Sequence, residues 1–332
     1  MNGEKAPYGV VSYDGIDLYH GDCLVESDKI KSGSVDLIIT DLPYGNMKNA
    51  PSTWDKSALS WDLAIPPHEI FSVANRILRK NGKAIFFSQE PYTTQLVSNA
   101  LPNLPFNYRA TWEKDSFANA LGVNVNMVSF TEDILIFSKN ECYEAKNPLR
   151  NVMLKYVYKY GKDFIIDLFL KEGRYTSELS ARVHASYKFA FNKGMRFDLM
   201  DCNLYDYLAE YIEFEETYQL LQSIDNQFKN EFASTFNLWE GKKYKSNILK
   251  YKKDYNGYHP TQKPILLLED LIKTFSNEND LVVDLTCGSG STLVACKNTN
   301  RRGIGIEMDD KYFEVAKQRV SDAINTKAAQ LF

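Results

Sequence analysis

Two short apolar segments limit the possible folds of this chain more than any other feature. Ser34–Thr40 is rich in β-branched residues, and Leu281–Asp284 has the same character. Continuous apolar runs of this length are typical of parallel strands that are covered on both faces. Pro43 and Gly45 end the first run directly after Asp41, and a glycine-containing loop follows the second. The pattern predicts an α/β fold with ligand-binding groups at the carboxyl edge of a parallel sheet.

The loop after the second segment has the sequence of a nucleotide-binding turn. It runs over Asp284–Thr292, and a helix is expected from Leu293. A further strand is predicted over 303–306, and it ends at Glu307. An acidic residue at this distance from a glycine turn typically binds ribose hydroxyls. The loop lacks the lysine of a P-loop, which argues against a triphosphate ligand.

The tetrapeptide Asp41-Leu42-Pro43-Tyr44 carries the second set of candidate groups. A carboxylate beside an aromatic ring, with a proline that frees nearby carbonyl groups, suits a planar molecule with an exocyclic amine. A polar turn at the end of a strand is the alternative that these four residues leave open.

Together with a third block, these motifs resemble a known family. The blocks are Asp41–Tyr44, His259–Pro264 (His-Pro-Thr-Gln-Lys-Pro) and the glycine loop Asp284–Thr292. In this order they resemble the amino-methylating, S-adenosylmethionine-dependent DNA methyltransferases of the permuted β group. The resemblance covers about the first 138 residues and the last 75. It implies a doubly wound, Rossmann-like sheet that is circularly permuted, because the strands that normally come first lie near the C-terminus.

The resemblance implies methylation of adenine N6 in double-stranded DNA, on a base turned out of the duplex. Asp41 would accept a hydrogen bond from the target amine, the carbonyl of Leu42 or Pro43 would accept the second one, and Tyr44 would stack on the base. The catalytic residues are therefore expected to be Asp41, Pro43 and Tyr44. Leu42 replaces the usual first proline of the family tetrapeptide at a position where no side chain is required. An aspartate rather than a serine at 41 favours adenine N6 over cytosine N4.

The resemblance also assigns the residues that bind S-adenosylmethionine. Glu307 is expected to hold the ribose hydroxyls, Asp22 the adenine amine, and Thr261 with Lys263 the methionine carboxylate. Leu285-Thr286 stands where the family commonly has Pro-Phe, which weakens the assignment of Thr286. Cys287 is expected to be a small packing residue rather than a nucleophile. The full predicted cofactor set is Asp22, Cys23, Thr261, Lys263, Asp284, Thr286, Cys287, Gly288, Ser289, Gly290, Thr292 and Glu307.

Composition agrees with a globular enzyme in a reducing compartment. The 332 residues are 44% hydrophobic, enough for a large core. The net charge is −4, so binding to nucleic acid requires a local basic patch. The five cysteines have no zinc-site spacing, and no metal is expected. An odd cysteine count without a secretion signal or long apolar run predicts a cytoplasmic protein that does not enter the membrane.

Three regions are expected along the chain. Residues 1–138 would form the catalytic half of the methyltransferase domain, 139–255 an inserted target-recognition region, and 256–332 the cofactor-binding half. The first half shows alternating elements: strands at 16–20, 83–88, 108–112 and 133–137, and a helix at 70–79 that Asn81-Gly82 would cap.

The middle region is expected to be mainly helical. Lys162–Leu170 reads as an amphipathic helix, and Thr176 is a candidate cap for a following short helix. A helix-turn-helix-like unit and an ordinary helical insertion both stay open. Near its end lie six lysines without an intervening acidic residue: Lys242, Lys243, Lys245, Lys250, Lys252 and Lys253. They suit contacts to DNA phosphates, and a solvated face is the alternative.

Several functions remain open on the sequence alone. Cytosine-N4 methylation uses the same chemistry, and RNA or protein-amide substrates are more distant possibilities. A DNA-binding specificity subunit with a degenerate catalytic domain is the alternative from another class, although the intact motifs argue against it. A homodimer and a cognate restriction endonuclease are possible partners.

Overall fold

The computed structural model describes residues 9–45, 64–118, 124, 127–139, 147–191, 197–232, 235–254, 257–258 and 262–329. The chain forms two compact units. The first combines Met1–Cys142 with Ser234–Phe332, and the second is Tyr143–Ala233. Each unit is described by itself.

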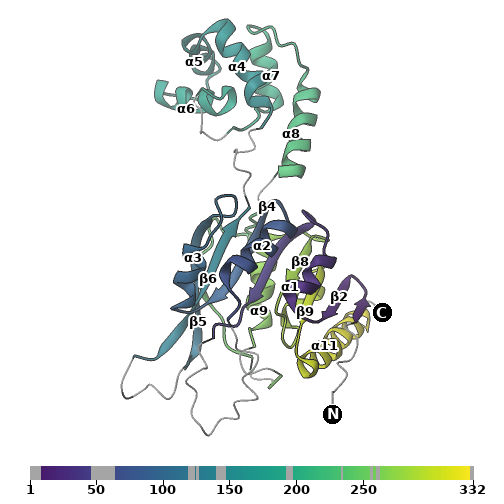
Figure 1. The fold of residues 1–332 in the computed structure, drawn as a ribbon. Helices are drawn as coiled ribbons and strands as arrows, with labels where there is room; N and C mark the ends of the chain where they lie inside the picture. The colour runs from purple at the N-terminus through teal and green to yellow at the C-terminus, as the bar shows by residue number, and fades with distance from the viewer. Residues whose placement is uncertain are drawn as a thin grey trace, which may run out of the picture. The chain divides into compact units, whose positions relative to one another are not determined.

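The first unit is built on one mixed sheet (Figure 1). In the described part of the chain the sheet has nine strands, in the order β1-β2-β9-β8-β3-β4-β6-β5-β7. The strands are β1 Val10–Tyr13, β2 Ile16–His20, β3 Val35–Asp41, β4 Leu78–Ser88, β5 Phe106–Ala118, β6 Ser129–Ser138, β7 Ile248–Lys250, β8 Leu281–Asp284 and β9 Arg302–Glu307.

The central strands are parallel, as the continuous apolar runs predict. β2, β9, β8, β3 and β4 pair in parallel, while β6 runs antiparallel to both β4 and β5. β3 lies between β8 and β4, with Leu37 opposite Val282 and Asp41 opposite Phe87. The N-terminal and C-terminal parts of the chain therefore contribute neighbouring strands, and the carboxyl ends of β3, β8 and β9 lie at one edge.

Helices cover both faces of the sheet. On β3, Leu37 and Ile39 belong to one buried core cluster and Ile38 belongs to another. Residues from α9, α10 and α11 complete the first cluster, and residues from α1, α2 and α3 complete the second. The bounds are α1 Cys23–Glu26, α2 Pro67–Ile77, α3 Tyr92–Ser98, α9 Ile265–Phe275, α10 Ser291–Asn298 and α11 Asp310–Ala329, with a short 3₁₀ turn at Ser27–Lys29.

One predicted boundary in this unit is wrong. Asn81-Gly82 was expected to end a helix, but α2 ends at Ile77 and β4 begins directly at Leu78. The Asn81 amide donates to the carbonyl of Lys139 at 2.8 Å, and the Lys139 amide donates to the carbonyl of Gly82 at 2.9 Å. These bonds continue the pairing toward the end of β6, so this turn-like dipeptide lies within a strand.

The second unit is mainly helical, as predicted. Its helices are α4 Leu149–Tyr160, α5 Lys162–Lys171, α6 Glu178–Phe189, α7 Cys202–Ala209 and α8 Tyr218–Phe232. It has a core of its own, which includes Leu149, Met153, Phe169, Phe189, Leu204 and Leu221. Ser177, one residue after the predicted Thr176, caps α6 by accepting a hydrogen bond from the Ser180 amide.

The helical unit is shorter than the predicted region 139–255. It ends at Ala233, and the residues after it belong to the sheet unit. There β7 pairs in parallel with β5, with Ile248 opposite Thr111. Part of the lysine-rich segment therefore lies on the sheet of the first unit. Among the described helices, none has the length and apolar character needed to cross a membrane.

Candidate active site

Asp41 and Tyr44 lie together at the carboxyl end of β3. The Tyr44 hydroxyl is 2.7 Å from Asp41 Oδ1 and 2.8 Å from Glu132 Oε1. A hydroxyl has one hydrogen, so Tyr44 donates to one of the two carboxylates at a time. The Tyr44 ring also packs beside Tyr92 of α3, with 6.1 Å between ring centroids. Tyr44 therefore links the tetrapeptide to Glu132 of β6.

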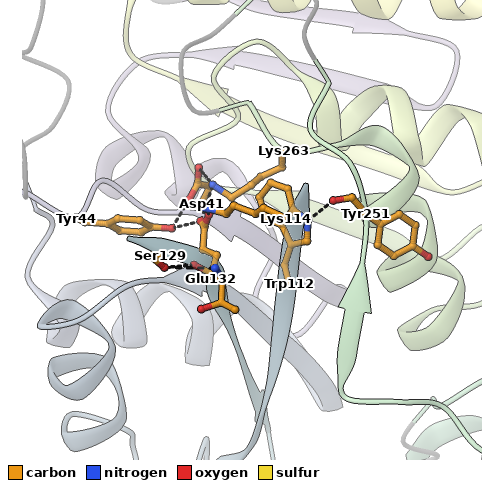
Figure 2. Close-up of polar contacts among 9 residues, drawn as sticks. Asp41, Tyr44, Trp112, Lys114, Ser129, Glu132, Tyr251 and Lys263 are labelled. Carbon is orange, nitrogen blue, oxygen red and sulfur yellow. Dashed lines mark hydrogen bonds and ion pairs between the residues drawn. The ribbon is translucent and has the colours of Figure 1, made fainter. Parts of the chain in front are cut away.

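Two lysines complete a charged cluster around these groups (Figure 2). The Lys263 ammonium pairs with Asp41 Oδ2 and lies 2.9 Å from Glu132 Oε1. The Lys114 ammonium lies 2.6 Å from Glu132 Oε2. The side chains of Lys263, Glu132 and Lys114 are only 5 to 7% exposed. Two cations and two carboxylates balance in charge, which makes the burial of Lys263, Glu132 and Lys114 beside the partly exposed Asp41 tolerable.

The environment shifts the pKa values of both carboxyl groups. Burial raises the pKa of Asp41, Lys263 opposes that rise, and the nearby Glu132 carboxylate adds to it. Burial acts in the same direction on Glu132, but Lys263 and Lys114 outweigh it and lower the pKa of Glu132 to about 2. Glu132 is therefore a fixed negative charge, while Asp41 is the carboxyl group that holds a proton more readily.

Strand pairing explains how Glu132 reaches the cluster. Trp112 of β5 is opposite Glu132 of β6, and Lys114 lies two residues further along β5. The Lys114 ammonium lies 4.9 Å from the centroid of the Trp112 ring. The Trp112 indole donates to the carbonyl of Tyr251 at 2.8 Å, which fixes the segment after β7 against this strand.

The glycine loop joins β8 to α10 and contacts the tetrapeptide directly. The Thr286 hydroxyl donates to the backbone carbonyl of Asp41 at 2.9 Å and is 2.8 Å from the Thr40 hydroxyl. Asp284 accepts from the Thr286 amide at 3.1 Å and from the Thr292 hydroxyl at 2.5 Å. Burial raises the pKa of Asp284 to about 6. The two motifs, which are far apart in sequence, thus form one continuous site.

Two glycines permit the course of this loop. Gly288 and Gly290 have φ values of 54° and 78°, which residues with a β-carbon rarely adopt. A β-carbon at Gly290 would lie 3.0 Å from the β-carbon of Ala316 in α11. Ser289 is held by Arg319, which donates to both its carbonyl and its hydroxyl at 2.7 and 2.8 Å.

Glu307 ends β9 beside the loop. Its Oε2 accepts from the Gly288 amide at 2.8 Å, and its Oε1 accepts from the Asp309 amide at 2.8 Å. Burial raises the pKa of Glu307 to about 7. The carbonyl of the same residue accepts from the Gly21 amide at 2.9 Å, which places the β2–α1 turn alongside.

Asp22 and Cys23 follow in that turn. Asp22 caps α1 by accepting from the Leu24 amide at 2.9 Å. Cys23 is buried, and burial raises the pKa of its thiol to about 12. Burial also raises the pKa of Cys287 well above its ordinary value. Neither thiol has the environment of a nucleophile.

The structure gathers nearly all the predicted residues at this edge of the sheet. Thr261 lies outside the described residues. Lys263 was predicted beside the methionine carboxylate, and here it contacts Asp41 and Glu132. Sequence reasoning missed Glu132 and Lys114. Neither residue gave a local signal, because Lys114 follows the predicted strand at 108–112 and Glu132 precedes the one at 133–137.

Comparison with known proteins decides the family. A family model described as N6_N4_Mtase, DNA methylase, matches residues 35–318. The chain belongs to the N6/N4 DNA methylase family. Membership confirms the predicted family and its methyl donor, S-adenosylmethionine, and makes DNA the substrate class.

Relatives extend over most of the chain. The type II methyltransferase M.HpaI of Haemophilus parainfluenzae is 26% identical over 298 residues, which are 89% of this chain and 71% of that protein. The DNA adenine methyltransferase YhdJ of Escherichia coli is 26% identical over 328 residues, 95% of this chain and 85% of that protein.

Two solved structures share the fold. The M1.HpyAVI–SAM complex has a TM-score of 0.50 and 20% identity, covering 92% of this chain and 99% of that one. The cytosine-N4-specific PvuII DNA methyltransferase also has a TM-score of 0.50, with 13% identity, and covers 95% of this chain and 93% of that one. The likeness confirms the mixed α/β fold of a DNA methyltransferase.

Proposed function

We propose that this DNA methylase transfers a methyl group to N6 of an adenine turned out of double-stranded DNA, within a specific sequence. The observation that carries this proposal is the contact between the two motifs. Thr286 of the glycine loop donates to the carbonyl of Asp41, so the predicted cofactor loop and the predicted catalytic carboxylate share one edge. A methyl donor bound by the glycine loop and a target amine bound by Asp41 would therefore lie next to each other.

Asp41 supplies the main chemical contribution. The lone pair of an exocyclic amine is delocalised into its ring, so the nitrogen is a poor nucleophile. A carboxylate that accepts a hydrogen bond from the amine draws the nitrogen toward tetrahedral geometry and stabilises the positive charge that develops on it. The carbonyl of Leu42 or Pro43 would accept the second amine hydrogen, and the Tyr44 ring would stack on the base.

The residues present fit S-adenosylmethionine. Glu307 and Asp22 would take the ribose and the adenine amine, and the backbone from Gly288 to Gly290 would line the methionine part. The Ser88 hydroxyl at the end of β4 and the side-chain amide atoms of Gln262 are buried and have no hydrogen-bond partner among the residues that the structure describes. Unpartnered buried polar atoms are rare, so a polar ligand at this edge would satisfy them. When bound, the cofactor supplies an activated methyl group on sulfur.

Adenine is favoured over cytosine by Asp41 at the head of the tetrapeptide and by the relative YhdJ, whose printed name is DNA adenine methyltransferase. The test is to express the chain in a methylase-deficient bacterial host and map modified bases by single-molecule sequencing. We expect N6-methyladenine at one consistent short motif. Modified cytosine N4 would overturn the choice of base, and unmodified DNA from cells that contain folded protein would overturn the activity.

The helical unit Tyr143–Ala233 is proposed as the principal target-recognition region because it is inserted in the sequence between the two parts of the sheet unit. The type II methyltransferases among the relatives support a setting in restriction–modification, with a cognate endonuclease that recognises the same motif. A homodimer is the assembly expected from the family resemblance.

The lysine-rich segment contains lysines of two kinds. The Lys245 ammonium lies 2.5 Å from Asp270 Oδ1 and 3.1 Å from Glu240 Oε1, and its side chain is 12% exposed. Lys242 pairs with Glu240, and Lys250 pairs with Glu113. Lys243 and Lys252 are exposed and make no ion pair with the described residues, whereas Lys242 and Lys250 are exposed but paired. Lys243 and Lys252 are therefore proposed to contact DNA phosphates. Lys245 stabilises the fold through its ion pairs with Asp270 and Glu240.

Replacing both Lys243 and Lys252 by alanine should weaken DNA binding about equally for every sequence. Removing one lysine–phosphate interaction should reduce the slope of log K against log salt by about one. Fluorescence anisotropy with a labelled duplex at several salt concentrations measures both effects. The matched control is Lys311→Ala, an exposed lysine on α11, which should leave the salt slope unchanged. An unchanged slope in the double variant would assign the segment to a solvated face.

A further inference from the structure

We infer that Glu132 is a positioning residue: it holds Tyr44 and Lys263 while the Asp41 carboxylate accepts the target amine. This inference rests on the proposed function, because it concerns the amine acceptor of the methylation reaction. It adds a residue from β6, a strand that none of the sequence motifs covers.

Two hydrogen-bond donors already contact the Asp41 carboxylate. Its Oδ1 accepts from the Tyr44 hydroxyl, and its Oδ2 accepts from the Lys263 ammonium. Both contacts compete with a substrate amine for the same carboxylate. A buried donor that turns away from Asp41 needs another acceptor, because a buried donor that loses its hydrogen bond costs free energy. A carboxylate has about four acceptor positions, and Asp41 offers more of them to the substrate amine when another group also accepts from Tyr44 and Lys263.

Glu132 Oε1 is that acceptor. It lies 2.8 Å from the Tyr44 hydroxyl and 2.9 Å from the Lys263 ammonium, so a single oxygen atom contacts both donors of Asp41. The two Tyr44 distances differ by little, so the hydroxyl hydrogen can turn from Asp41 to Glu132 without displacement of the ring. Asp41 Oδ1 then gains a free acceptor position, and Tyr44 keeps its hydrogen bond.

Lys114 keeps Glu132 in place and charged. It binds the other oxygen, Oε2, at 2.6 Å, and its side chain is as deeply buried as that of Glu132. Oε1 therefore points toward Tyr44 and Lys263 while Oε2 is held from β5 (Figure 2). This three-sided arrangement gives Glu132 one orientation, and it distinguishes Glu132 from a carboxylate that merely balances charge.

The charge of Glu132 also acts on Asp41. The charged and titratable groups that face Asp41 are Lys263 before α9, Tyr44 after β3, Glu132 on β6 and Asp284 on β8. Glu132 raises the pKa of Asp41, whereas Lys263 lowers it. Without the negative charge of Glu132, the lowering effect of Lys263 on the pKa of Asp41 would no longer be opposed by that charge. The aspartate would then become a weaker acceptor with a lower pKa.

The test replaces Glu132 by glutamine, which keeps the shape and removes the charge. Methyl transfer to a duplex that carries the mapped motif is measured against pH, and cofactor binding is measured by calorimetry. We expect kcat to fall by about tenfold or more near neutral pH. The acid limb of the kcat/KM profile should move to lower pH, because that limb reports ionisation of Asp41. Cofactor affinity should not change.

Two further variants make the outcome decisive. Glu132→Gln combined with Lys114→Met restores the charge balance of the cluster, so it protects the fold and should keep the shifted acid limb. Glu113→Gln removes an exposed carboxylate from the neighbouring strand β5 and should leave the acid limb in place. An acid limb that stays at the wild-type pH in both Glu132 variants, with cofactor bound, would overturn the inference while the methylation itself stands.

If both Glu132 variants lose cofactor binding, Glu132 is required for folding and the inference is wrong. If the wild-type protein transfers no methyl group to any DNA although it binds S-adenosylmethionine, the proposed function fails, and the positioning role fails with it.

Discussion

Methyl transfer should fall by at least about a hundredfold when Asp41 is replaced by alanine, while S-adenosylmethionine still binds. The carboxylate lies at the end of β3 and contacts Tyr44 and Lys263. Its removal takes away the acceptor that makes the amine nucleophilic, but it leaves the glycine loop and Glu307 intact. Transfer of a radiolabelled methyl group measures the first effect, and calorimetry with S-adenosylmethionine measures the second.

The matched control is Asp28→Ala, which removes an exposed carboxylate that pairs with Arg76. It should retain wild-type transfer, since Asp28 lies in the 3₁₀ turn after α1 and does not contact the charged cluster. Transfer close to wild type in the Asp41 variant would exclude Asp41 as the catalytic acceptor. Loss of cofactor binding in that variant would instead indicate collapse of the shared edge.

Cofactor affinity should weaken by about tenfold to a hundredfold when Glu307 is replaced by alanine. The glutamate holds the Gly288 amide at 2.8 Å, and a ribose hydroxyl would donate to the same carboxylate. The variant loses both the ribose contact and one support of the loop. Calorimetric titration with S-adenosylmethionine measures the change, and Glu314→Ala on α11 is an exposed control. If the Glu307→Ala variant binds S-adenosylmethionine with wild-type affinity, Glu307 does not bind the cofactor.

The raised pKa of Glu307 gives this prediction a pH dependence. Burial raises the pKa to about 7, so the carboxyl group is largely protonated at pH 6 and largely ionised at pH 8. An ionised carboxylate is the stronger acceptor for a ribose hydroxyl. Wild-type affinity for S-adenosylmethionine should therefore rise between pH 6 and pH 8. Glu307→Gln should show a flatter dependence, because glutamine does not titrate.

The parts of the fold that the sequence predicts well are those with a strong local signal. The apolar runs that became β3 and β8 need burial on both faces, and only the centre of a parallel sheet provides it. The failures have equally physical causes. Asn81-Gly82 is a good turn sequence, but pairing beside β6 overrides it. Thr176 and Ser177 are both good helix caps, so local chemistry alone could not choose between them.

The active site also contains residues that the sequence predicts and residues that it does not. Asp41 and Tyr44 belong to one continuous motif and the glycine loop is another, so the chemistry of each can be predicted from its own residues. Glu132 and Lys114 meet only because β5 and β6 pair in one particular register. No local pattern specifies that register, and the tetrapeptide gives no sign of the charged partners that Asp41 acquires. The partners of a buried catalytic carboxylate are a tertiary property, so they emerge only with the sheet assembled.

The order of strands in the sheet also has a consequence during synthesis. β3 ends at Asp41, and its neighbour β8 begins at Leu281, so about 240 residues separate them in the chain. At roughly 5 to 20 residues per second, a ribosome needs about 10 to 50 seconds to bridge that interval. Throughout it, the nascent chain carries an apolar strand with one edge uncovered, while the helical unit leaves the ribosome and can form its separate core. Shielding of that edge by a chaperone would matter most in this interval, before about the last sixth of the protein exists.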